Sequence, residues 1–144
     1  MSDDRLTIAE AAERTGLTAH TLRYYERDGL MLDVGRDVAG HRRFSERDLG
    51  WIELITKLRR TGMAIRDVRR YAEMVRAGEG NEAERLALLR AHRDGVRARL
   101  AETAEQLEAI ELKVDFYAAA VGEFDPDAEL MGDSSDRLTE RRPA

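Results

Sequence analysis

Apolar residues recur at spacings of three and four in several segments of the first half of the chain, which is the pattern of amphipathic helices. Thr7, Thr18 and Ser45 each precede such a segment and can cap it through a side-chain oxygen. Gly16 can end the first helix in a tight turn. The pattern predicts helices after Thr7, Thr18 and Ser45 and another over residues 65–77, the first two forming a helix-turn-helix unit.

Residues 31–44 have no helical stripe. They carry Gly35, a turn-forming stretch that ends at Gly40, and then alternating cationic and bulky residues up to Phe44. A short hairpin, or wing, fits this pattern, with a solvated loop as the alternative.

A heptad pattern extends over residues 82–121, with some polar interruptions such as Arg93 and Thr103. A helix of this length measures about 60 Å at 1.5 Å per residue, which is too long for one small domain to bury. It therefore needs a partner helix, and its Glu- and Arg-rich flanks favour a two-chain coiled coil. The predicted dimerisation residues are Leu86, Leu89, Val96, Leu100, Leu107, Ile110, Val114 and Tyr117.

Composition agrees with a mainly α protein, because the 144 residues include only 2 prolines. Cysteine is absent, which excludes disulfides and thiolate metal sites, and we expect no metal or cofactor. There is no apolar run of membrane-spanning length and no targeting pattern, so we expect a cytoplasmic protein with no membrane partner.

The net charge of −5 is unevenly distributed. Residues 1–76 carry 15 Arg and Lys against 13 Asp and Glu, whereas residues 77–144 carry 9 against 16. Only the first part of the chain therefore suits nucleic acid as a partner.

The second predicted helix is the candidate DNA-reading element. Leu22 and Tyr25 fall on one face of it and can pack, while the opposite face carries small, polar and guanidinium groups that suit a major groove. The alternative is an ordinary amphipathic helix with a solvated basic face. The candidate DNA-binding residues are Thr18, Ala19, His20, Thr21, Arg23, Tyr24 and Arg27 on this helix, Arg36, His41, Arg42 and Arg43 in the wing, and Lys57 and Arg60 at the end of the third helix. The last two could instead only offset the dipole of that helix.

Several blocks in order resemble the MerR family of bacterial transcription regulators over residues 5 to about 76: residues 8–17, Thr21-Leu22-Arg23-Tyr24-Tyr25-Glu26, Gly29-Leu30, Gly40-His41-Arg42-Arg43-Phe44-Ser45 and Asp48-Leu49. The resemblance implies a winged helix-turn-helix domain and a homodimer joined through antiparallel long helices. It also implies double-stranded promoter DNA as a partner, with a pseudo-palindromic operator whose over-long spacer is bent and untwisted for RNA polymerase.

Family positions can be carried over to this chain one by one. Arg23, Tyr24 and Arg42 match positions that contact DNA, and residues 18–20 match variable reading positions. His41 stands where the family wing usually has Tyr, which puts one phosphate contact in doubt. Met63-Ala64 replaces an aromatic residue and a better cap, a difference that concerns packing.

Metal- and redox-sensing members of this family use cysteines near the end of the long helix, and this chain has none. The wall of a pocket for a small organic effector could come from Tyr71, Met74, Phe116 and Tyr117, with Asp115 available for a cation, although plain core packing is the simpler interpretation. No catalytic motif is present, so we expect no enzyme activity.

The predicted organisation is a DNA-binding domain over residues 1–76, a hinge over 77–81, a dimerisation helix over 82–121 and an acidic, disordered tail over 122–144. Two other functions fit the same features. One is an architectural or excisionase-like protein that bends DNA without an effector. The other is a coiled-coil adaptor that binds an acidic protein.

Overall fold

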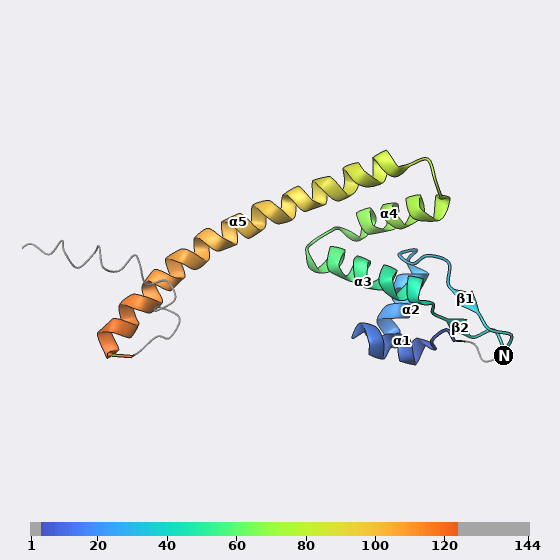
Figure 1. Ribbon diagram of the computed structural model, residues 1–144, viewed down its shortest axis with the longest axis horizontal. Coiled ribbons are helices and arrows are strands. Elements are labelled where there is room, and N and C mark those ends of the chain that lie inside the picture. Colours follow the sequence, from blue (N-terminus) through green and yellow to red (C-terminus); the bar gives the residue numbers. More distant parts are fainter. Residues whose placement is uncertain (1–3, 124–144) are drawn as a thin grey trace, which may run out of the picture. The chain divides into compact units, whose positions relative to one another are not determined.

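The computed structural model describes residues 4–123, and most of the predicted tail lies outside them. The described chain is mainly helical, as predicted, with one small antiparallel hairpin (Figure 1). Its elements are α1 (Ile8–Thr15), α2 (Ala19–Arg27), β1 (Gly35–Arg36), β2 (Arg42–Arg43), α3 (Glu46–Arg60), α4 (Ile65–Ala77) and α5 (Glu82–Val121). None of the helices in residues 4–123 is both long and apolar enough to span a membrane.

The helix starts are held by the predicted caps. The Thr7 hydroxyl accepts the Glu10 N–H while the Glu10 carboxylate accepts the Thr7 N–H, and Ser45 and Asp48 form the same reciprocal pair before α3. These bonds to Thr7 lower the pKa of the Glu10 carboxyl. Ala64 caps α4 with no side-chain bond, in keeping with the weaker cap expected there.

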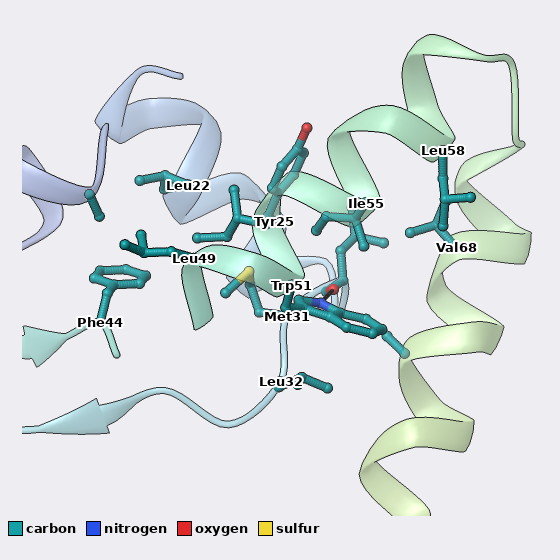
Figure 2. Close-up of a cluster of buried hydrophobic side chains, with 14 of the residues drawn as sticks. Leu22, Tyr25, Met31, Leu32, Phe44, Leu49, Trp51, Ile55, Leu58 and Val68 are labelled. Atoms are coloured by element: carbon teal, nitrogen blue, oxygen red, sulfur yellow. Dashed lines mark hydrogen bonds between the residues drawn. The ribbon is translucent and has the colours of Figure 1, made fainter. Parts of the chain in front are cut away.

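The core lies around α3, whose buried face meets α1, α2, the wing base and α4 (Figure 2). Trp51 of α3 stacks on Tyr71 of α4, with ring centroids 5.3 Å apart, and its indole N–H donates to the Leu30 carbonyl at 2.8 Å. Leu54, also on α3, is 36% exposed. The largest fully buried side chains are Phe44, Leu22, Leu30, Ile52, Ile55 and Val68.

The predicted hairpin is present, with Gly35 opposite Arg43 and Arg36 opposite Arg42. Its base is joined to the start of the chain, since Leu6 and Phe44 exchange two backbone hydrogen bonds of 2.8 Å. Because Leu6 precedes α1 and Phe44 precedes α3, this pairing ties the base of the wing to the starts of both helices.

The chain divides into two compact units, Met1–Val96 and Arg97–Ala144. The first unit extends past the predicted boundary at residue 76, because the first turns of α5 fold back onto the corner between α3 and α4. His92 and the Thr61 hydroxyl are 2.8 Å apart, and Leu88 and Leu89 pack against the core. Leu89, a predicted dimer contact, is partly buried against its own chain, and its place in a dimer stays a prediction.

Candidate nucleic-acid interface

The turn between α1 and α2 has the geometry that the sequence predicts. Gly16 ends α1 in the left-handed region at φ 72°, where a residue with a Cβ would be strained. The Thr18 hydroxyl then accepts the Thr21 N–H at 3.0 Å and lies 3.0 Å from the Thr21 hydroxyl. The start of α2 is thus fixed by local bonds of its own side chains.

One face of α2 is buried and the other is exposed. Leu22 and Tyr25 are 1% and 8% exposed, whereas His20, Arg23 and Arg27 lie on the exposed face. The Arg27 guanidinium lies 5.8 Å from the centroid of the Tyr24 ring, within the range of a cation–π contact. Ala19, Thr21 and Tyr24 lie partly buried at the edges of this face.

Asp37 organises the tip of the wing. Its Oδ1 accepts the N–H groups of Ala39 and His41, both at 2.9 Å, and its Oδ2 accepts from Arg43 Nε at 3.1 Å. The His41 N–H is the main cause of the lowered pKa of the Asp37 carboxyl, opposed by desolvation and helped by Arg43 and Ala39. Arg36 also supports the turn, because its guanidinium donates to the Gly40 carbonyl at 2.8 Å.

Arg42 and Arg43, both predicted to contact DNA, have protein partners as Arg36 does. The Arg43 Nε donates to the Asp37 carboxylate, which helps to hold the turn. The Arg42 Nε donates to the Glu26 carboxylate of α2, which uses one of its five donors and couples the wing to the reading helix. His41 is exposed. Val38, at the tip of the wing, is also fully exposed, and the sequence of the turn does not indicate an exposed valine there.

Lys57 and Arg60 are exposed at the C-terminal end of α3. The wing joins the other end of this 15-residue helix, about 20 Å away along its axis. The structure therefore does not bring these two cations together with the wing.

The four predicted effector-wall residues fall in two separate units. Tyr71 stacks on Trp51 and Met74 is 8% exposed, so both are core residues of the first unit. Phe116 and Tyr117 lie on the later part of α5, each 63% exposed, with their rings edge to face at 5.2 Å. Asp115 is also exposed on that part of the helix. Among residues 4–123 there is no group of three or more His, Asp or Glu side chains placed to hold a metal ion.

Sequence reasoning missed a set of side chains that hold the turn after α2. The carbonyls of Asp28, Gly29, Leu30 and Met31 each accept a bond from Arg69, Trp51 or Arg76. These donors are 21 to 47 residues away in sequence, and on α4 the arginines resemble ordinary surface residues, so no local pattern indicates them.

Comparison with known proteins identifies the family. The model of the MerR HTH family regulatory proteins matches residues 6–75. An uncharacterised HTH-type transcriptional regulator from Haemophilus influenzae is 41% identical over 114 residues, which are 79% of this chain and 84% of the relative. The chain belongs to the MerR family.

Solved structures of other MerR regulators share the fold. The crystal structure of HiNmlR, a MerR family regulator lacking the sensor domain, bound to promoter DNA, is 40% identical and has a TM-score of 0.75. The match covers 83% of this chain and 96% of that one. A putative MerR family regulator from Listeria monocytogenes is 34% identical with a TM-score of 0.76, covering 95% and 99% of the two chains. This MerR-family chain is thus a DNA-binding transcriptional regulator by family and fold.

Proposed function

We propose that this MerR-family regulator binds a promoter operator as a homodimer, with α2 of each copy in a major groove and the wing beside the neighbouring backbone. The observation that carries the proposal is the two-faced α2, whose Leu22 and Tyr25 are buried while His20, Arg23 and Arg27 are exposed. Arg can bond guanine bidentately, and the helix presents it beside short polar side chains that let the backbone approach the bases. Promoter DNA is bound by the relative HiNmlR.

The unpartnered apolar surface of α5 supports the dimer. Among its 40 residues none is buried, and Leu100, Leu107, Ile110 and Val114 are each more than half exposed along the predicted seam. Exposed apolar surface that repeats over several turns of one helix is typical of a helix that packs on another chain.

Charge along α5 supports an antiparallel pairing. Residues 82–100 carry five Arg against three Asp and Glu, whereas residues 101–121 carry five Asp and Glu against one Lys. Antiparallel helices bring the basic part of each copy beside the acidic part of the other, and parallel helices would bring like charges together.

Two reading helices held at a fixed spacing bind two half-sites only if the DNA between them has a matching geometry. Where the spacer is over-long, bending and untwisting it satisfies both helices and realigns the promoter elements that RNA polymerase binds. The polymerase is therefore the proposed second partner, and a small organic effector would act by changing the spacing of the two heads.

The test begins with selection of a duplex from a random-sequence pool by the wild-type protein, followed by titration against a scrambled duplex. Arg23→Ala is expected to lose about tenfold to a hundredfold in affinity for the selected duplex, with the dimer intact in sedimentation. Arg66→Ala is the matched control, because Arg66 is an exposed arginine on α4 whose side chain is 86% exposed. Unchanged affinity of Arg23→Ala, or no preference of the wild type for any duplex, would contradict the proposal.

A further inference from the structure

The turn that follows the reading helix is held by side chains of other helices. α2 ends at Arg27, and its last carbonyls accept the N–H groups of residues 28–30, so the carbonyls left to be satisfied are those of the turn itself. Gly29 then takes a left-handed conformation at φ 75°, and the chain turns into the core at Leu30. Carbonyls that point outward from such a turn need donors from elsewhere.

Two arginines of α4 supply most of these donors. Arg69 Nε donates to the Asp28 carbonyl at 2.9 Å, and Arg69 Nη2 lies 3.8 Å from the Asp28 carboxylate. Arg76 Nη1 donates to the carbonyls of Gly29 at 3.0 Å and Met31 at 2.6 Å. Trp51 of α3 donates to the carbonyl between them, that of Leu30.

We propose that Arg69 and Arg76 are positioning residues for DNA recognition, which hold the C-terminal end of α2 and thereby set the angle at which its exposed face meets the bases. The inference rests on the proposed reading role of α2. Neither arginine was a candidate from sequence, and neither acts on DNA directly in this proposal, because its bonds are to the protein backbone.

The geometry favours this role over a simple contribution to stability. Arg69 and Arg76 are seven residues apart, so they lie two turns apart on the same face of α4. Both act at the end of α2 opposite to Thr18, and α2 is 9 residues, or about 13 Å, long. A small tilt at the held end therefore moves the side chains at the start of the helix, and base contacts tolerate displacements of only about 0.5 Å.

The C-terminal end of α4 is connected to α5 within the first unit. Asn81 donates to the Met74 carbonyl at 2.8 Å, and Arg85 donates to the carbonyls of Met74 and Gly78. The end of α4 that bears Arg76 is thus held by the start of the dimerisation helix. In this proposal the orientation of α2 depends, through Arg69 and Arg76 of α4, on the start of α5, the helix proposed to pair with the partner copy.

The test compares Arg69→Met and Arg76→Met with the wild type, using the full chain. Methionine keeps the length and apolar packing of the side chain but donates no hydrogen bond. Each protein is titrated with the duplex selected by the wild type and with a scrambled duplex, at several salt concentrations. Arg66→Met, on the same helix but without these bonds, is the control for loss of one positive charge.

The proposal predicts about a tenfold loss of preference for the selected duplex over the scrambled one, with the slope of log K against log salt unchanged. A residue that contacts phosphate would instead lower that slope by about 0.9 and weaken binding to both duplexes alike. Arg76→Lys keeps the positive charge and a donor group, so it should retain most of the preference for the selected duplex. If Arg76→Met does not fold, the same titrations are made with Arg76→Lys.

Two results would overturn the inference while the proposed function stands: a lowered salt slope, or an unchanged preference in folded variants that are only less stable to heat. Failure of the wild type to prefer any duplex would overturn the proposed function, and this inference with it. Arg23→Ala serves as the internal reference, because its loss of preference confirms that α2 is the reading element even where the α4 variants behave as the wild type.

Discussion

At the scale of single residues, Asp37 shows how one carboxylate orders a whole turn. It accepts two backbone N–H groups and the Arg43 side chain, so the tip of the wing depends on its negative charge. A single side chain can also join two elements, because the bond from Arg42 to Glu26 ties the wing to α2. Cations that look alike in sequence therefore have different contacts in the fold, and Arg23 on the exposed face of α2 remains the candidate for base contact.

The wing is expected to lose order at acid pH as Asp37 is protonated. Its pKa in the folded protein is lowered below the ordinary value of 3.8, mainly by the His41 N–H. A lowered folded pKa means that the stabilisation is complete above 3.8 and is lost as the pH falls through the folded value. NMR titration should show the Asp37 carboxyl and the Ala39 and His41 amides changing together, with a midpoint below 3.8.

Asp37→Asn is the control for this titration, since it keeps one acceptor oxygen but removes the titrating group. The step should then disappear from the Ala39 and His41 amides. A midpoint at or above 3.8 for Asp37 in the wild type would show that these bonds do not favour its charged form.

At the scale of elements, α5 has two different surroundings along its length. Its first turns pack partly on their own unit through Leu88, Leu89 and His92, although Leu86 there is 47% exposed. The later turns expose apolar residues on the seam, with Leu112 and Phe116 exposed off it, at 66% and 63%. Of the predicted seam residues, those from Leu100 onward are therefore expected to contribute most to the dimer.

Leu100→Asp and Leu107→Asp should weaken the dimer by at least about a hundredfold, because a dimer that buries the seam would bury each leucine in both copies. Sedimentation over a range of protein concentrations measures this change. Leu112→Asp is the matched control, since Leu112 is as exposed as Leu100 but lies off the seam. Dimers that survive both seam substitutions, or that are lost with Leu112→Asp, would contradict the predicted seam.

At the scale of the whole molecule, the proposed regulator is a pair of reading heads whose spacing is set by two long helices. In this proposal the uneven charge of α5 sets how these helices pair, and the contacts from α5 through α4 to the end of α2 would connect that pairing to the orientation of α2. DNA specificity then belongs to the dimer rather than to one domain, because half-site spacing is a property of both copies.

A charge-reversal cycle tests the direction of pairing. Arg97 and Glu111 occupy the same flanking position of the heptad, in the basic and the acidic part of α5. In an antiparallel dimer, Arg97→Glu and Glu111→Arg should each weaken association by roughly threefold to tenfold, and the double variant should recover most of the loss. Parallel pairing predicts instead that Arg97→Glu leaves association unchanged or strengthens it, because it relieves repulsion between like charges. Sedimentation at low salt distinguishes the two arrangements.

The sequence by itself determined the elements and the family. Thr7, Thr18 and Ser45 cap the helices as predicted, the hairpin lies where glycine and alternating residues indicate it, and the motif around Arg23 identifies the MerR family. Such signals are local, because caps, turns and amphipathic faces depend on neighbours three or four residues apart. The predicted DNA contacts and seam residues remain predictions.

Only the tertiary structure decided which side chains serve the fold. It showed that Leu89 packs partly against its own core, that Arg43 bonds to Asp37 in the wing turn, and that Arg69 and Arg76 bond to carbonyls more than forty residues earlier in the chain. These contacts depend on which surfaces of separate helices meet. The local sequence around a hydrogen-bond donor on an amphipathic helix does not indicate which distant acceptor it will reach. The turn after α2 is therefore held by residues that can be found only once the helices are packed together.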